Sequence, residues 1–296
     1  MGYYLLRLFL LICVRLPLPV LHATGRGWSA LLMHIPNRSR QTTLTNLALC
    51  FPDMPAAERR ALCRESLYHT ACTALEMGKA WLWPMQRTIS LVREVEGGHL
   101  LQQALQSGQG TIILVPHLGN WEIFGLHLAH NPTHNTDTTF MYLPPKHQAL
   151  NQLLLKTRSR AGLTMAPANR KGVAMIIKAL NRNALTGILP DQLPTNQGAL
   201  HANLFNQPAL TMTLISRLLQ NKSITVLCGF AERLPAGAGF KVHLQKADPA
   251  IHDSNLQHSV EALNRTIENT VKQAPAQYQW EYKRFRRPPD GRKVYH

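Results

Sequence analysis

Short apolar runs alternate with segments of helical periodicity from residue 111 to the C-terminus, and this alternation limits the folds open to the chain. The apolar runs, predicted to be strands, are TIILV (111–115), TFMYL (139–143), ALTGILP (184–190), SITVLCGFA (223–231) and GFKVHLQKA (239–247). The predicted helices are a stretch ending near His130 and residues 147–162, 172–183, 208–221 and 254–273. Strands that alternate with helices predict an α/β fold, a mixed central sheet flanked by helices. In such sheets reactive side chains gather at the carboxyl ends of strands, where His117 and Asp191 fall.

The preceding block, residues 26–100, is predicted to be helical. In AAERRALCRESLYHTACTALEMGKAWLW (56–83), apolar residues recur at helical spacing, and Pro55 stands just upstream as a start signal. Glu76 lies in this helix, where we expect a half-exposed side chain. The predicted organisation is one domain over residues 26–296, with a helical part (26–100) and an α/β core (101–296).

Residues 1–25 form a separate apolar segment that contains Arg7 and Arg15. The uncharged stretch between these arginines, from Leu8 to Val14, is far shorter than the roughly 20 residues that span a bilayer. A secretory signal peptide would have a cleaner apolar stretch and a small-residue cleavage site. We therefore expect an uncleaved membrane anchor that enters or lies in the interface, with basic residues near lipid phosphates. A buried domain helix is the alternative.

Composition narrows the classes of partner. Hydrophobic residues make up 45% of the chain, which excludes global disorder, whereas charged residues make up only 16%, which favours contact with something apolar. The formal net charge of +16 favours polyanions, either nucleic acid or an anionic membrane surface. The five cysteines form no C-x-x-C pair and suit neither zinc nor a disulfide framework, so we expect free thiols.

The motif VPHLGNWE (115–122) follows the first apolar run. Gly119 and Asn120 are typical of a turn into a helix. On one helix, side chains five positions apart point about 140° apart, so His117 and Glu122 meet only if His117 precedes the helix. A carboxylate on one imidazole nitrogen would make the other a better base toward a hydroxyl. The motif holds no serine or cysteine, so this hydroxyl need not belong to the protein and can come from the substrate. The spacing alone leaves an ordinary turn histidine open.

HLGNWE resembles the H-x4-D/E signature of glycerolipid-type acyltransferases, in the form carried by the late acyltransferases of lipid A biosynthesis. Four further blocks resemble this family in the same order, so that the likeness covers nearly the whole chain: RSRQTTLTNLALCFPDMPAAERRAL (38–62), MYLPPKHQALNQLLLKTRSRAG (141–162), ILPDQLPTNQGALHANLFNQPALTMT (188–213) and APAQYQWEYKRFRRPPDG (274–291). Members of the family are bacterial inner-membrane enzymes that transfer a lauroyl, myristoyl or similar chain from acyl carrier protein. The acceptor is a hydroxyl on an acyl chain already attached to the glucosamine disaccharide.

The resemblance implies a role for each matching residue. His117 would be the general base and Glu122 its orienting partner. Arg158 would hold a substrate phosphate or stabilise the oxyanion formed at the thioester carbonyl. The implied substrate-binding residues are Asn120, Arg160, Asp191 and Gln192. From the residues alone, Arg158 would be a solvated helix-end cation, and Asp191 could instead cap the loop that follows it.

Three features lie outside these roles. Leu143 stands where the family usually has an arginine, which puts a second cationic contact in doubt. His127, His130 and His134 lie close in sequence but lack a further well-spaced ligand, so no metal is expected. The basic and aromatic segment KRFRRPPDGRK (283–293) lacks a nucleic-acid fold signature. We expect it to meet anionic headgroups, lipid A phosphates or acyl carrier protein, with a solvated tail as the alternative.

The resemblance and these residues together predict a membrane-associated acyltransferase at the cytoplasmic face of a bacterial inner membrane. The predicted reaction is direct transfer from an acyl thioester to a hydroxyl of a lipid A precursor, with an apolar groove for the acyl chain. We expect no cofactor beyond the acyl donor, acyl carrier protein or coenzyme A, and no nucleic-acid partner. Two alternatives stay open: an acyltransferase of lysophospholipids or aminolipids that uses coenzyme A thioesters, and a non-catalytic lipid-binding relative.

Overall fold

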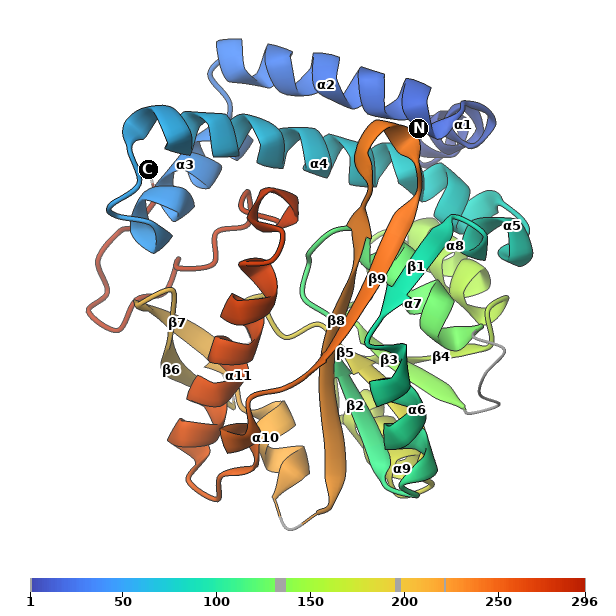
Figure 1. The fold of residues 1–296 in the computed structure, drawn as a ribbon, viewed down its shortest axis with the longest axis vertical. Coiled ribbons are helices and arrows are strands. Elements are labelled where there is room, and N and C mark those ends of the chain that lie inside the picture. The colour runs from blue at the N-terminus through green and yellow to red at the C-terminus, as the bar shows by residue number, and fades with distance from the viewer. Residues whose placement is uncertain (1, 131–136, 195–197, 221, 296) are drawn as a thin grey trace.

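The computed structural model describes residues 2–130, 137–194, 198–220 and 222–295 (Figure 1). Its α-helices are α1 (Gly2–Arg15), α2 (Leu18–His34), α3 (Arg38–Cys50), α4 (Ala56–Leu82), α5 (Met85–Ile89), α6 (Gly98–Gln106), α7 (Trp121–Ala129), α8 (Gln148–Ser159), α9 (Arg170–Leu180), α10 (Leu214–Leu219) and α11 (Leu256–Val271). Its strands are β1 (Val92–Glu96), β2 (Gly110–Leu114), β3 (Thr138–Tyr142), β4 (Leu163–Pro167), β5 (Leu185–Ile188), β6 (Ala199–Leu204), β7 (Gln207–Met212), β8 (Ile224–Arg233) and β9 (Phe240–Lys246). The described residues also form three 3-10 helices: η1 (Pro235–Gly237), η2 (Pro249–His252) and η3 (Pro275–Gln277).

A central sheet with the strand order β1-β9-β8-β2-β5-β3-β4 organises the molecule (Figure 1). Neighbouring strands of this sheet are parallel, except that β8 and β9 pair antiparallel. The middle strand, β2, is buried along its whole length, as expected for a parallel strand covered by helices on both faces. The predicted α/β architecture, a mixed central sheet flanked by helices, is confirmed.

The core has two layers, and side chains of β2 and of Val115 just after it contribute to both. Ile112 and Leu114 belong to a cluster that also contains side chains of α9, α10 and α11. Ile113 and Val115 belong to a second cluster with side chains of α6, α7 and the N-terminal helices α1 and α2. Successive side chains of a strand point to opposite faces, so the two clusters lie on the two sides of the sheet.

Helix α4 joins both layers and carries the first two helices on its outer side (Figure 1). The packing is close: a Cβ at Gly78 of α4 would lie 2.7 Å from the carbonyl oxygen of Leu10 in α1. In the part of the chain that the structure describes, no helix is both long and apolar enough to cross a membrane. The membrane anchor over residues 1–25 therefore stays a prediction, and its boundary falls inside α2.

Two segments predicted as helices contain strands. Within residues 208–220, which the structure describes, only α10 is helical, because β7 pairs with β6 through a tight turn at Phe205 and Asn206. Both residues have positive φ (50° and 59°), the backbone of a two-residue hairpin. In the block 26–100, residues 92–96 form β1, which pairs with β9 at the sheet edge. Strand β4 was not among the predicted strands.

Candidate active site

Parallel pairing brings His117 and Asp191 together. Leu114, the last residue of β2, pairs with Ile188, the last residue of β5. His117 and Asp191 each follow their strand end by the same number of residues, and each comes directly after a proline. Because the carboxyl ends of parallel neighbours lie at one edge of a sheet, the two side chains meet there.

The carboxylate of Asp191 binds His117 at two atoms. Oδ1 accepts a hydrogen bond from the imidazole Nδ1, and Oδ2 accepts one from the backbone N–H, both at 2.8 Å. Burial raises the pKa of Asp191, but the charge and hydrogen bonds of His117 outweigh it and hold this pKa below its usual value. An ionised Asp191 keeps the proton on Nδ1 and leaves Nε2 as the basic nitrogen.

The basic nitrogen lies among polar and aromatic groups. The side-chain amide of Gln192 donates to His117 Nε2 at 3.1 Å, and the ring of Trp121 contacts the imidazole edge-on with centroids 4.9 Å apart. Gln192 also donates to the side-chain oxygen of Gln279 at 3.4 Å. A substrate hydroxyl that reaches Nε2 must take the place of the Gln192 amide.

The turn after His117 is held tightly between other elements. Gly119 has φ +62°, and a Cβ there would lie 2.0 Å from the carbonyl oxygen of Ala231 in β8, so the position requires glycine. Asn120 is the N-cap of α7, with its Oδ1 accepting from the Ile123 N–H at 3.0 Å. The predicted strand, turn and helix around VPHLGNWE are confirmed.

Glu122 contacts Arg158 and not His117. Its Oε1 accepts from Arg158 Nη2 at 2.5 Å, and its Oε2 accepts from the indole N–H of Trp81 at 3.1 Å. The expectation that Glu122 orients the imidazole is therefore wrong, because α7 directs this carboxylate toward α8 while Asp191 occupies Nδ1. Arg158 is likewise not a solvated helix-end cation, since its side chain is 17% exposed and paired.

Asn120 and Arg160 bind the protein itself. Both ends of the Asn120 amide are used, since its Nδ2 donates to Glu76 at 2.8 Å while its Oδ1 caps α7. Arg160 donates to the carbonyl oxygens of Trp81 and Trp83, at the end of α4. These contacts give both residues structural roles, and their predicted substrate binding stays a prediction. Asp191 and Gln192 each form a hydrogen bond with the His117 imidazole.

An apolar hollow opens beside the Glu122–Arg158 pair. Its empty space is about 350 Å³ when the open solvent at its mouth is counted, and about 30 Å³ of it is within reach of the centre of a water molecule. Its lining residues are Trp121, Glu122, Gly125, Leu126, Phe140, Met141, Arg158, Leu163 and Leu189. Trp121 lines this hollow and also contacts His117, so one side chain borders both the imidazole and the apolar space.

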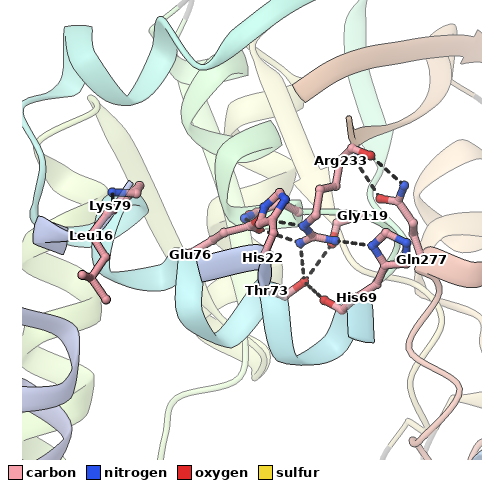
Figure 2. A network of polar contacts seen from close by, with 10 residues as sticks. Leu16, His22, His69, Thr73, Glu76, Lys79, Gly119, Arg233 and Gln277 are labelled. Carbon is pink, nitrogen blue, oxygen red and sulfur yellow. Dashed lines mark hydrogen bonds and ion pairs between the residues drawn. The ribbon is translucent and has the colours of Figure 1, made fainter. Parts of the chain in front are cut away.

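A second polar cluster, missed in the sequence, surrounds Glu76 (Figure 2). This carboxylate is 1% exposed and accepts from Arg233 Nε and Nη2 at 2.6 Å and from His22 Nε2 at 2.8 Å. Burial raises the pKa of Glu76, but Arg233 outweighs it and brings this pKa to about 2. The expectation of a half-exposed Glu76 is wrong. Its apolar neighbours in TALEMGKAW were the available signal, whereas nothing marked Arg233.

The C-terminal basic segment is partly core. Arg284 and Phe285 of this segment are buried, as is Trp280 just before it, and the Arg284 guanidinium donates to the Leu210 carbonyl and the Thr211 hydroxyl. A wholly solvated tail is therefore excluded.

Leu143 is 74% exposed after β3. His134 lies outside the described residues. Within those residues, no group of three or more His, Cys, Asp or Glu side chains could hold a metal ion.

The chain is similar to known proteins along nearly its whole length. A family model for bacterial lipid A biosynthesis acyltransferases matches residues 1–287. A lipid A biosynthesis lauroyltransferase from Escherichia coli (strain K12) is 26% identical over 285 residues, which cover 94% of this chain and 89% of the relative. A lipid A biosynthesis palmitoleoyltransferase from the same strain is 26% identical over 283 residues, with coverage of 94% and 89%. A lipid A biosynthesis acyltransferase from Haemophilus influenzae is 29% identical over 283 residues, with coverage of 93% and 87%. Because the family model spans nearly the whole chain, this protein is an acyltransferase that belongs to the bacterial lipid A biosynthesis acyltransferase family.

Proposed function

We propose that the protein transfers a fatty acyl chain from acyl carrier protein to a hydroxyl of a lipid A precursor, with His117 as the general base. The observation that carries the proposal is the pairing of His117 Nδ1 with the buried Asp191, which leaves Nε2 as the nitrogen that accepts a proton once the acceptor hydroxyl displaces the Gln192 amide. Burial raises the pKa of the Cys63 and Cys72 thiols to about 11, so neither is a thiolate nucleophile at neutral pH.

The transfer is direct. His117 Nε2 removes the proton of the acceptor hydroxyl as its oxygen attacks the thioester carbonyl. A C–O bond forms, the C–S bond breaks, and the imidazolium returns the proton to the departing thiolate. Arg158 stabilises the intermediate oxyanion, because a guanidinium has five N–H donors and Glu122 engages only its Nε and Nη2.

The acyl chain of the donor occupies the apolar hollow. Leu126, Phe140, Leu163 and Leu189 give it an apolar wall, while Glu122 and Arg158 mark its polar end. A fatty chain gains about 0.8 kcal/mol for each methylene removed from water, so this wall holds the chain while the thioester stays near Arg158. The depth of the hollow then limits the chain length.

Helices α1 and α2 rest on the membrane interface at its cytoplasmic side. Their outer surface carries exposed apolar side chains, among them Leu5 (60%), Leu8 (56%), Ile12 (53%) and Trp28 (54%). Arg7, between two of these residues, is also exposed. An apolar face with basic neighbours suits a layer of anionic headgroups, and the net charge of +16 adds a long-range attraction.

A transfer assay with purified protein tests this function. The wild-type protein, a ladder of acyl-carrier-protein thioesters and a lipid A precursor should give a product whose mass rises by one acyl group. His117→Ala should lower kcat by about 10²-fold or more while the fold is kept. Full activity of His117→Ala would end the general-base role. If a strain that lacks the gene keeps its lipid A unchanged and shows altered phospholipids, the acceptor is not a lipid A precursor.

A further inference from the structure

The Glu76 cluster contacts the turn that follows His117. Asn120 Nδ2 donates to Glu76 Oε2 at 2.8 Å, while the Oδ1 of the same side chain caps α7 at Ile123. The backbone N–H of Asn120 donates to the Ala231 carbonyl at 2.8 Å. The Asn120 amide thus connects a buried carboxylate on α4 to the first turn of the helix that bears Glu122.

Arg233 is connected to the same turn through two further residues, Thr73 and Gln277 (Figure 2). Its Nη2 donates to Thr73 Oγ1 at 2.8 Å, and the single proton of this hydroxyl is shared between the carbonyls of His69 at 3.0 Å and Gly119 at 3.3 Å. The Arg233 backbone exchanges two hydrogen bonds with the side chain of Gln277. The backbone carbonyl of Gln277 in turn accepts from the Gly119 N–H at 3.0 Å. Residues 119 and 120 are therefore bound from α4, β8 and η3 through one cluster.

His117 lies just before this turn and Glu122 just after it. We propose that Glu76 is a positioning residue for the acyl transfer: through Asn120 it fixes the turn that sets His117 relative to the Glu122–Arg158 pair. The inference rests on the proposed role of His117 as the base. A displacement of about 1 Å between reacting groups can lower a rate by about 10²-fold, so small freedom in this turn has a measurable cost.

Stability alone is a weak reason for this cluster. Buried ion pairs are often replaced by apolar residues without loss of stability, because desolvation offsets the attraction between the charges. The hydrogen bond from the neutral Asn120 amide to Glu76 instead fixes the position of the Asn120 side chain, and with it the turn. His22 of α2 binds the same carboxylate at 2.8 Å, so the N-terminal helices contribute to the placement of the turn.

Asn120→Ser breaks the connection from the side of the turn. Serine remains a good N-cap, so α7 keeps its first hydrogen bond while the contact with Glu76 is lost. We expect kcat to fall about 10-fold to 100-fold with little change in KM for the donor. Asn169→Ser is the matched control, because Asn169 caps α9 in the same way through the Gly172 N–H and should leave kcat unchanged.

The double variant Glu76→Leu/Arg233→Met breaks the connection from the other side without leaving a buried charge unpaired. Adding Asn120→Ser to this background should lower kcat no further, because the connection is already absent. Losses that simply multiply would show that Glu76 does not act through Asn120. If the double variant fails to fold, the Asn120→Ser and Asn169→Ser pair still decides.

Amide hydrogen exchange of residues 119–124 provides a readout that does not depend on activity. Asn120→Ser should raise exchange at these amides at least tenfold, whereas Asn169→Ser should not. Exchange like that of the wild type in Asn120→Ser, or an unchanged kcat, would overturn the positioning role. A wild-type protein without transfer activity would instead refute the proposed function, and the exchange data would still test the positioning of the turn.

Discussion

Asp191 fixes His117 through the backbone and the side chain at once, with its two carboxylate oxygens each 2.8 Å from a His117 nitrogen. The backbone contact fixes the position of the His117 main chain, and the Nδ1 contact fixes the orientation of its ring. Asp191 is 2% exposed, so solvent does not compete for either contact. The imidazole therefore presents Nε2 in one orientation and one tautomer, as a general base requires.

Asp191→Asn should lower kcat by about 10²-fold or more with a small effect on KM. An amide cannot stabilise the imidazolium, and its NH2 group favours the wrong tautomer. Steady-state kinetics with one acyl-carrier-protein thioester measures the effect. Asp253→Asn is the matched control, because Asp253 faces the exposed ring of His258 at 3.3 Å and should leave kcat unchanged. A fully active Asp191→Asn would exclude the orienting role.

Arg158→Lys should lower kcat at least about tenfold although the charge is kept. Arg158 uses Nε and Nη2 on the two oxygens of Glu122, and a lysine ammonium cannot reproduce that planar fork. Arg265→Lys, which alters a half-exposed arginine pair with Asp248, is the control and should have no effect on kcat. Equal kinetics for Arg158→Lys and the wild type would show that any cation suffices there.

The sequence predicted what depends on local pattern, and it failed where contacts join distant segments. Alternating apolar runs predicted β2, β5 and β8, and the glycine and asparagine of HLGNWE predicted the turn after β2. The partner of His117 was predicted five residues away, whereas the imidazole contacts Asp191, which is 74 residues away. That distance closes only because β2 and β5 are neighbours, which no local pattern reveals. Arg233, 157 residues from Glu76, was missed for the same reason.

Phe140→Leu should shift the donor preference toward longer acyl chains. Phe140 lines the apolar hollow and lies so close to Gly187 that a Cβ there would be 2.4 Å from the ring. Shortening this side chain extends the hollow, and two buried methylenes are worth about 1.6 kcal/mol, or about tenfold in relative kcat/KM. Competition between acyl-carrier-protein donors that differ by two carbons measures the ratio.

Leu126→Phe, on the same wall, should have the opposite effect and favour shorter chains. Phe205→Leu removes the same volume from the other core cluster and should leave the preference unchanged. An unchanged preference in both hollow variants would place the acyl chain elsewhere.

His69→Asn should flatten the pH dependence of stability between pH 6.5 and about 3. Burial, then the charge of Arg233, lower the pKa of His69 to about 3, and its Nδ1 accepts from Arg233 Nη1 at 3.0 Å. The unfolded chain binds a proton near pH 6.5 while the folded chain does not, so stability falls as the pH drops through this window. The slope is up to about 1.4 kcal/mol per pH unit. Asparagine keeps an acceptor for Arg233 but does not titrate.

Urea unfolding at pH 6.5, 5.5 and 4.5 measures this difference, because the contribution of Glu76, with its pKa of about 2, is lost only below its ordinary value of 4.5. His258→Asn, at an exposed histidine, should keep most of the wild-type slope. Parallel curves for His69→Asn and the wild type would rule out a His69 that stays neutral in the folded protein.

Leu8→Glu/Ile12→Glu should reduce binding to vesicles that contain anionic lipid by at least about tenfold. Both side chains are more than half exposed on α1, whereas Leu10 and Cys13 of the same helix are buried against the protein. Two carboxylates on the outer face lose the gain from inserting apolar surface and repel anionic headgroups, without disturbing the packed face. Flotation of the protein with vesicles measures the bound fraction.

Val95→Glu, at an exposed apolar residue on the edge strand β1, is the control and should bind as the wild type does. Equal loss in both variants would point to a general charge effect, and no loss in either would place the membrane contact on another surface.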